Sequence, residues 1–179
     1  MKQQVGILNC NGKYFNLKAS LNYYYAYIYS KLNYGINAWG GVLLAHSASN
    51  ELKNLHNKVV KILFARFFNL KTAEQVFSRL KILKLEDIYR YNLMITMFNI
   101  AKRDRIPFMY IKISRFGFKH AYNTRNNILR LPICYNSFFT YNFVYRAIKV
   151  FNDIPNKLKN IVNFNSFKNC LKKYFVDKY

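Results

Sequence analysis

Apolar residues recur at helical spacing in the first part of the chain. A stripe with intervals of three and four residues follows Ser20, which is a suitable N-cap, so we expect a helix from Ser20 to about residue 32. The next segment, 34–41 (YGINAWGG), contains three glycines that favour turns, and we expect it to end this helix. The apolar residues of this first stripe are Leu21, Tyr24, Ile28 and Leu32.

Three further helices are predicted before residue 107. The first begins at Ser49 or Asn50, the second is short and capped by Thr72, and the third is long and ends before Pro107. Their expected ranges are 50–67, 72–80 and 85–103. The apolar stripe of the first contains Leu52, Leu55, Val59, Ile62, Leu63 and Phe67. That of the long helix contains Ile88, Tyr91, Ile95 and Phe98, widened by Met94, Met97 and Ala101.

The helical period is lost after Pro107 and returns near residue 141. Residues 120–132 (HAYNTRNNILRLP) are polar and rich in Asn, which indicates a loop. We expect a helix over 141–153 and a last helix capped by Ser166. The fold class is therefore mainly α, a helical bundle with an irregular, loop-rich insertion. The predicted segments are a loosely structured lead-in (1–19), a helical region (20–106), an Arg/Asn-rich loop region (107–140) and a C-terminal helical region (141–179). The alternative interpretation of the first segment is the last part of a fold whose beginning is missing.

The excess of basic over acidic residues indicates a polyanionic partner. The 179 residues include 29 Lys and Arg against 7 Asp and Glu, a formal net charge of +22, and 52% of them are hydrophobic. A basic chain with a hydrophobic core most often binds nucleic acid, and an anionic membrane surface comes second. A bias toward A/T-rich codons is the alternative explanation, because Lys, Asn, Tyr, Phe and Ile make up about half of the chain.

Several classes of protein are not expected. Three widely separated cysteines do not indicate a disulfide framework or a zinc site. The chain has no apolar run long enough for a membrane span and no sustained apolar region that would suit a signal peptide. We therefore expect a reduced, intracellular protein, cytoplasmic or nuclear, without a membrane partner.

Catalytic chemistry is not indicated by the residues. Most acidic side chains fall at predicted helix ends, where capping and the helix dipole explain them. The adjacent pair Glu86 and Asp87 is interpreted as a helix start, with a divalent-ion site as the alternative. No catalytic residue and no metal ligand is predicted.

Basic and aromatic residues are the candidates for binding. Arg side chains, amides and hydroxyls hold phosphates and sugars, and a tyrosine ring can stack on an unpaired base. An internal loop network and solvated helix faces are the alternative interpretations. The predicted nucleic-acid-binding residues are Tyr122, Asn123, Arg125, Arg130, Arg146, Lys149, Lys168, Lys172 and Lys173. A separate run of tyrosines covers all sides of one helix, so some of them must be exposed or contact a partner: Tyr23, Tyr24, Tyr25, Tyr27 and Tyr29.

Four segments in this order carry a resemblance to a known family. They are NYYYAYIYSKLNYGINAWG (22–40), ILKLEDIYRYNLMITMFNI (82–100), HAYNTRNNILRLP (120–132) and YRAIKVFNDIPNKLKNIVNFNSFKNCLKKYF (145–175). Together they resemble the C-terminal part of reverse transcriptases from non-LTR retrotransposons, the jockey-like or LINE-type elements. The residues that match the family pattern are His120, Tyr122 to Asn126, Leu129 to Pro132 and Ser166 to Lys168. A departure is the stretch 133–142, which lacks the expected Gly and basic residues.

The resemblance implies the thumb and the following helices of an RNA-directed DNA polymerase, with the thumb-like part over 20–106. The family's palm holds divalent metal ions, Mg²⁺, on an aromatic-x-Asp-Asp motif, and this sequence contains no Asp-Asp pair. We therefore expect no polymerase activity and no cofactor on this chain. The implied partners are RNA and DNA, as a template–primer duplex gripped by its backbone, and the palm and fingers domains that are missing here.

Two other functional interpretations remain open at the level of sequence. The first is a decayed fragment without function, which the codon bias would explain. The second is a host-recruited module whose Tyr-rich helix binds another protein.

Overall fold

A computed structural model describes residues 2–43, 48–103 and 131–179. All regular secondary structure in these three stretches is helical, so the chain is mainly α, as the hydrophobic pattern predicted. The elements are α1 (Lys2–Asn11), the 3-10 turn η1 (Gly12–Tyr14), α2 (Leu17–Tyr23), the π-helical η2 (Tyr24–Tyr29), α3 (Ser30–Asn33), α4 (Ile36–Leu43), α5 (Ala48–Phe68), α6 (Ala73–Leu80), α7 (Leu85–Arg103), the 3-10 turn η4 (Ser137–Tyr141), α9 (Phe143–Asp153), α10 (Asn156–Lys159) and α11 (Phe164–Val176).

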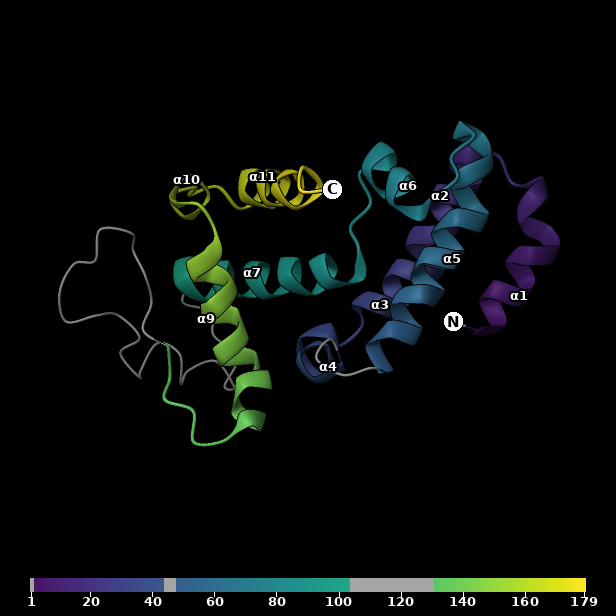
Figure 1. Cartoon of the computed structure of the whole chain (residues 1–179). Helices are drawn as coiled ribbons and strands as arrows, with labels where there is room; N and C mark the ends of the chain where they lie inside the picture. Colours follow the sequence, from purple (N-terminus) through teal and green to yellow (C-terminus); the bar gives the residue numbers. More distant parts are fainter. Residues whose placement is uncertain (1, 44–47, 104–130) are drawn as a thin grey trace.

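Helix α7 is the central element of the fold. It runs across the middle of Figure 1, and α4, α9 and α11 all pack against it. A helix with neighbours on several sides buries residues around much of its circumference, and Tyr89 and Leu93 are accordingly buried although they lie outside the predicted stripe. Tyr91 and Ile95, which belong to that stripe, are only half-buried. The single-stripe prediction for this helix was therefore too narrow.

Helix α11 covers one side of α7. It turns Phe167, Leu171 and Phe175 into the core, and the Phe167 ring stacks on Phe98 of α7 with centroids 4.5 Å apart. Burial of three large side chains contributes several kcal/mol, at roughly 1.5–3 kcal/mol for each. This packing determines which side of α11 is left for its lysines.

The other end of the molecule is built on α5. Helices α1, α2 and α6 pack against α5, and α1 lies at the outer edge in Figure 1. The fully buried Tyr24 of η2 lies against Phe64 of α5 and bonds through its hydroxyl to Nε2 of His56, 3.0 Å away. A polar pair inside this core is tolerated because the two groups satisfy each other.

The prediction of a loosely structured lead-in over 1–19 was wrong. Residues 2–11 form α1, which buries Val5 and Leu8 and packs against α5. The apolar stripe of this segment is too short to indicate a stable helix by itself, and the contact with α5 supplies the stabilisation that local sequence lacks.

Two predicted caps were displaced by three or four residues. Helix α2 begins at Leu17, where the Asn16 side chain accepts a hydrogen bond from the Ala19 amide at 2.7 Å, and Ser20 is buried inside the helical run. Helix α11 begins at Phe164, where Asn163 accepts from two backbone amides, so Ser166 is not its cap. Asparagine is as good an N-cap as serine, and in both helices the asparagine that precedes the predicted serine is the cap.

The prediction that residues 34–41 form a break holds only for Tyr34 and Gly35. Gly35 has φ +60, the left-handed conformation that glycine adopts easily, and the chain turns there. Gly40 and Gly41 lie inside α4 instead. A Cβ on Gly40 would stand 2.6 Å from the Tyr89 ring, and one on Gly41 would stand 2.3 Å from the Tyr141 carbonyl oxygen. These glycines permit close packing rather than a turn.

The predicted cap of α5 was also wrong, because Ser49 and Asn50 lie inside this helix, which spans Ala48–Phe68. The helix predicted over 141–153 begins at Phe143, with Asn142 as its N-cap. The boundaries of α6 and α7 agree with the predictions. Thr72 caps α6 in a reciprocal capping box with Gln75, and α7 spans Leu85–Arg103. Of the predicted loop region 107–140, only 131–140 lies within the described residues, and η4 begins there at Ser137.

Candidate nucleic-acid interface

The predicted contact residues divide between described and undescribed parts of the chain. Arg146 and Lys149 lie on α9, and Lys168, Lys172 and Lys173 lie on α11. The remaining residues, Tyr122, Asn123, Arg125 and Arg130, lie outside the described residues.

The lysines of α11 lie on the faces that packing leaves uncovered. Lys173 is exposed, while Lys168 and Lys172 are half-buried. The Lys168 ammonium lies 5.4 Å from the centre of the Phe164 ring, and Lys178 just beyond the helix lies 4.3 Å from that of Tyr174. Ammonium groups resting on ring faces keep their charge while their stems cover apolar surface. The end of the chain thus combines cations with aromatic rings.

Carboxylate side chains of α5, α6 and α7 are paired with cations outside α11. Salt bridges join Lys2 to Glu51 at 2.7 Å, Lys53 to Glu86 at 2.5 Å, Lys84 to Glu74 at 3.4 Å and Arg90 to Asp87 at 3.0 Å. Within the described ranges, Lys149, Lys168, Lys172 and Lys173 take part in no ion pair. Residues 157–178 contain six lysines and one aspartate. The lysines of this segment therefore keep most of their capacity to bind an external anion.

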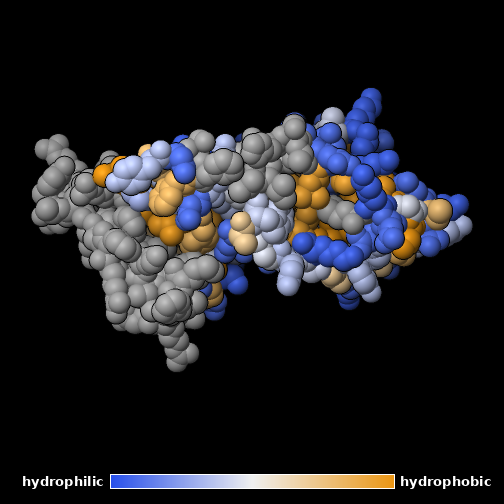
Figure 2. All heavy atoms as spheres, turned by 90° about the horizontal axis from the view of Figure 1, so that it is seen from below, coloured by the Kyte–Doolittle hydropathy of each residue, from blue (hydrophilic) through white to orange (hydrophobic). Residues whose placement is uncertain are grey.

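Basic residues are also present at the opposite end of the molecule. Figure 2 shows hydrophilic residues over much of the end that contains α1 and α5, with hydrophobic residues between them. Lys13 of η1, Lys18 of α2, and Lys58 and Lys61 of α5 are exposed. Net charge alone consequently does not single out α11 as the binding surface.

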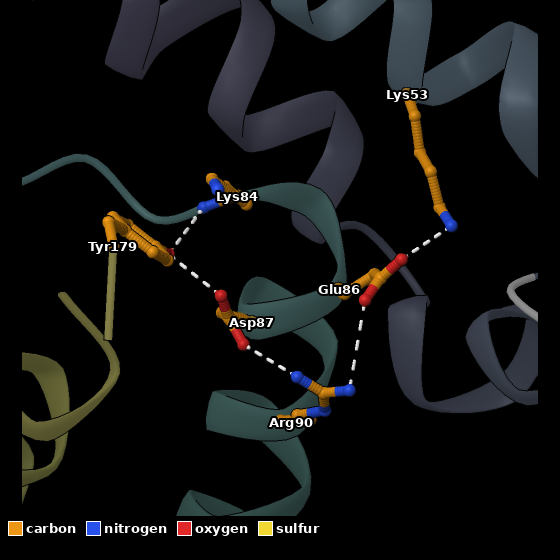
Figure 3. A network of polar contacts seen from close by, with 6 residues as sticks. All are labelled: Lys53, Lys84, Glu86, Asp87, Arg90 and Tyr179. Atoms are coloured by element: carbon orange, nitrogen blue, oxygen red, sulfur yellow. Dashed lines mark hydrogen bonds and ion pairs between the residues drawn. The ribbon is translucent and has the colours of Figure 1, made fainter. Parts of the chain in front are cut away.

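The acidic pair at the start of α7 belongs to a structural network (Figure 3). Asp87, 6% exposed, accepts a hydrogen bond from the Tyr179 hydroxyl at 2.8 Å and pairs with Arg90. The same hydroxyl accepts from the Lys84 amide at 2.9 Å. A hydrogen bond from Lys53 holds the pKa of Glu86 below its usual range. The contacts favour the helix-start interpretation of this pair over a divalent-ion site, because both carboxylates already have cationic or hydroxyl partners.

Arg146 of α9 is half-buried. It lines a cavity of about 160 Å³ between α4, α7 and α9, together with Gly41, Glu86, Tyr89, Arg90 and Val150. Its buried Nε and the buried Tyr89 hydroxyl have no hydrogen-bond partner among the described residues. Burial raises the pKa of Tyr89 to about 12, so this hydroxyl stays protonated at neutral pH. Lys149, less than one turn further along α9, is exposed.

A second cavity joins the Tyr-rich segment to α11. It measures about 140 Å³ and is lined by Tyr25 and Tyr29 of η2, Ile82 and Leu83 before α7, Tyr91 of α7 and Lys172 of α11. The tyrosine run and Lys172 were predicted separately, and no pattern in the sequence connects them. They are about 145 residues apart, and no periodicity relates such distant positions.

The predicted residues therefore form two groups. Arg146 belongs to the cavity beside α4 and α9, whereas Lys172 belongs to the cavity beside η2 and α11. Both cavities use residues of α7, which separates the two groups. The structure does not bring Arg146 and Lys172 into one site.

The tyrosine run is divided by its surroundings. Tyr24 is fully buried, Tyr23 and Tyr29 are half-buried, and Tyr25 and Tyr27 are 41% and 54% exposed. The expectation that part of this run is exposed is confirmed.

Comparison with protein-family models, curated proteins and solved structures gives no match. In the part of the chain that the structure describes, no helix combines the length and the apolar character needed to cross a membrane. The same part contains no cluster of three or more His, Cys, Asp or Glu side chains arranged to hold a metal ion.

Proposed function

We propose that this chain binds nucleic acid through its C-terminal helical region, and that it corresponds to the thumb and following helices of a non-LTR reverse transcriptase without the palm. On this proposal the chain does not polymerise DNA. The divalent metal of the reaction belongs to the palm of a complete enzyme, and template–primer RNA and DNA are the partners.

One observation carries the binding proposal. The lysines of α11 have no ion pair among the described residues, although the acidic side chains of the α5–α7 region are nearly all paired. An unpaired lysine beside others of the same charge is repelled by them, and a phosphate backbone relieves that repulsion. The bound phosphates release condensed counterions, which makes the affinity strongly dependent on salt.

A salt titration tests the proposal. Fluorescence anisotropy would measure the affinity of the chain for RNA, DNA and RNA–DNA hybrid duplexes of equal length, from low to physiological salt. We expect a linear fall of log affinity with log salt. Substitution of Lys168, Lys172 and Lys173 by Gln should reduce the slope by about one for each of these lysines that binds a phosphate.

The matched control removes the same charge from the other end of the molecule. Lys13, Lys58 and Lys61 are exposed, so the triple Gln variant at these positions changes the net charge equally without touching α11. We expect it to keep most of the wild-type slope. Equal losses in the two triple variants would contradict a localised interface, and affinity that is absent at low salt or independent of salt would contradict the binding proposal itself.

Two simpler measurements address the rest of the proposal. Primer extension by the purified chain with Mg²⁺ should give no product, and a product would overturn the assignment as a palm-less fragment. Circular dichroism should show a cooperative thermal transition, because the helices share one core. A chain without such a transition would support the alternative of a decayed fragment.

A further inference from the structure

We propose that the cavity between η2, α7 and α11 binds one unpaired base of a single-stranded nucleic acid, while Lys172 binds a neighbouring phosphate. This inference rests on the proposed function and makes it more specific. Backbone contacts alone do not distinguish a duplex from a single strand, whereas a pocket for a base selects a strand whose bases are free.

The cavity has the size of one aromatic ring. Its volume of about 140 Å³ is close to that of cavities in protein cores that hold a single benzene molecule, about 150 Å³. A pyrimidine base has one six-membered ring and is close to benzene in size, whereas a purine has two fused rings and is larger. We therefore expect pyrimidine bases to bind more tightly than purines.

Aromatic side chains line the cavity in a suitable geometry. Tyr25 and Tyr29 meet in a T-shaped contact with ring centroids 5.6 Å apart, and Tyr91 reaches the cavity from α7. Ile82 and Leu83, which are almost fully buried, supply apolar contacts. Burial raises the pKa of Tyr29 to about 12, so its hydroxyl remains a neutral hydrogen-bonding group for a base edge.

The backbone supports the same assignment. Residues 24–29 are π-helical rather than α-helical, a rare conformation that occurs frequently at functional sites. Three of these six residues are tyrosines that are not fully buried, Tyr25, Tyr27 and Tyr29. Two of the three line the cavity, so the irregular turn contributes aromatic rings to its wall.

Electrostatics favours this cavity over the one beside Arg146. Among the described residues that line it, Lys172 carries a charge and none is a carboxylate. Lys168 and Lys173 lie near Lys172 on α11 and add to the positive potential. The Arg146 cavity, in contrast, contains Glu86, and its Arg90 is already held by two carboxylates.

The test compares two ligands that carry the same phosphates. Anisotropy would measure binding of the full chain to oligothymidylate of about ten nucleotides and to an abasic oligonucleotide of the same length at low salt. We expect the chain to bind oligothymidylate about tenfold more tightly, because stacking of one base on aromatic side chains is of this magnitude. Tyr25→Leu should remove most of this preference, while Tyr27→Leu, on the same turn but outside the cavity, should retain it.

The outcomes separate this inference from the proposed function. Equal affinity for the two ligands, or equal behaviour of the two leucine variants, would overturn the base pocket while leaving backbone binding intact. Absence of binding to either ligand at low salt would overturn both. Lys172→Gln should weaken binding of both ligands, because both contain the phosphates.

A second measurement uses the unmodified chain and so does not depend on the folding of a variant. An oligonucleotide containing 5-iodouridine would be photocrosslinked and the crosslinked peptide identified by mass spectrometry. Crosslinks at Tyr25, Tyr29 or Tyr91 support the pocket. Crosslinks confined to exposed tyrosines elsewhere, such as Tyr34 and Tyr135, would overturn it.

Discussion

Acidification below pH 7 should destabilise this protein through one buried histidine. His56 on α5 is 1% exposed, its Nε2 lies 3.0 Å from the Tyr24 hydroxyl, and its ring lies 5.2 Å from the Phe77 ring centre. Burial lowers the pKa of His56 to about 4, because the charged imidazolium would lose its hydration. The folded protein therefore holds this histidine neutral.

The magnitude follows from the difference in pKa between the two states. In the unfolded chain His56 titrates near its ordinary pKa of about 6.5. Between about pH 6.5 and pH 4 the unfolded chain binds a proton that the folded chain does not, so the free energy of unfolding falls as the pH falls. The contribution is fully present above pH 6.5. The loss reaches about 2 kcal/mol at pH 5 and about 3 kcal/mol at pH 4.

Urea unfolding followed by circular dichroism at pH 7 and pH 5 measures this loss. For a chain of this size, 2 kcal/mol corresponds to a fall in Tm of about 4–8 °C. His56→Gln should unfold more easily at both pH values, but it should lose much less stability between them, because glutamine does not titrate. Glu51 and Glu86, whose pKa values are lowered by lysines, respond below about pH 4.5 and contribute little in this interval.

The control is a variant that keeps His56 and replaces the other two histidines of the chain. His46 and His120 lie outside the described residues, and the double substitution of both by Gln should preserve the wild-type dependence on pH. If His56→Gln loses as much stability between pH 7 and pH 5 as the wild type, the buried-histidine explanation is wrong.

Two further predictions concern packing and the network at the start of α7. Gly41→Ala should lower the free energy of unfolding by about 1–3 kcal/mol in urea, because the added Cβ meets the Tyr141 carbonyl, whereas Gly6→Ala in α1 has open space around it and should raise stability by up to about 1 kcal/mol. Equal effects of the two alanines would refute the packing argument. Tyr179→Phe should cost about 1–2 kcal/mol in the same assay, since it removes the hydroxyl that joins Asp87 to the Lys84 amide. Tyr135→Phe, at a residue 93% exposed, serves as its control and should change stability little.

Much of the candidate interface was visible in the sequence, but its organisation was not. The lysines of α11 were identified because they alternate with apolar residues at helical spacing. The cavity that Lys172 shares with Tyr25 and Tyr91 could not be predicted, because it depends on how α11 packs against α7. Arg146 was predicted to bind nucleic acid, and its position in the wall of the cavity beside α4 and α7 likewise depends on contacts between helices.

The sequence by itself determined that this protein is helical and strongly basic, that Thr72 caps one helix and that another begins at Leu85, because periodicity, charge and capping depend on residues a few positions apart. The tertiary structure alone decided that α1 is an ordered helix, that Gly40 and Gly41 are packing residues, and which tyrosines are exposed. These properties depend on contacts between elements far apart in the chain. The free energy of such a contact depends on both of the surfaces that pack together, whereas a local sequence pattern describes only one of them.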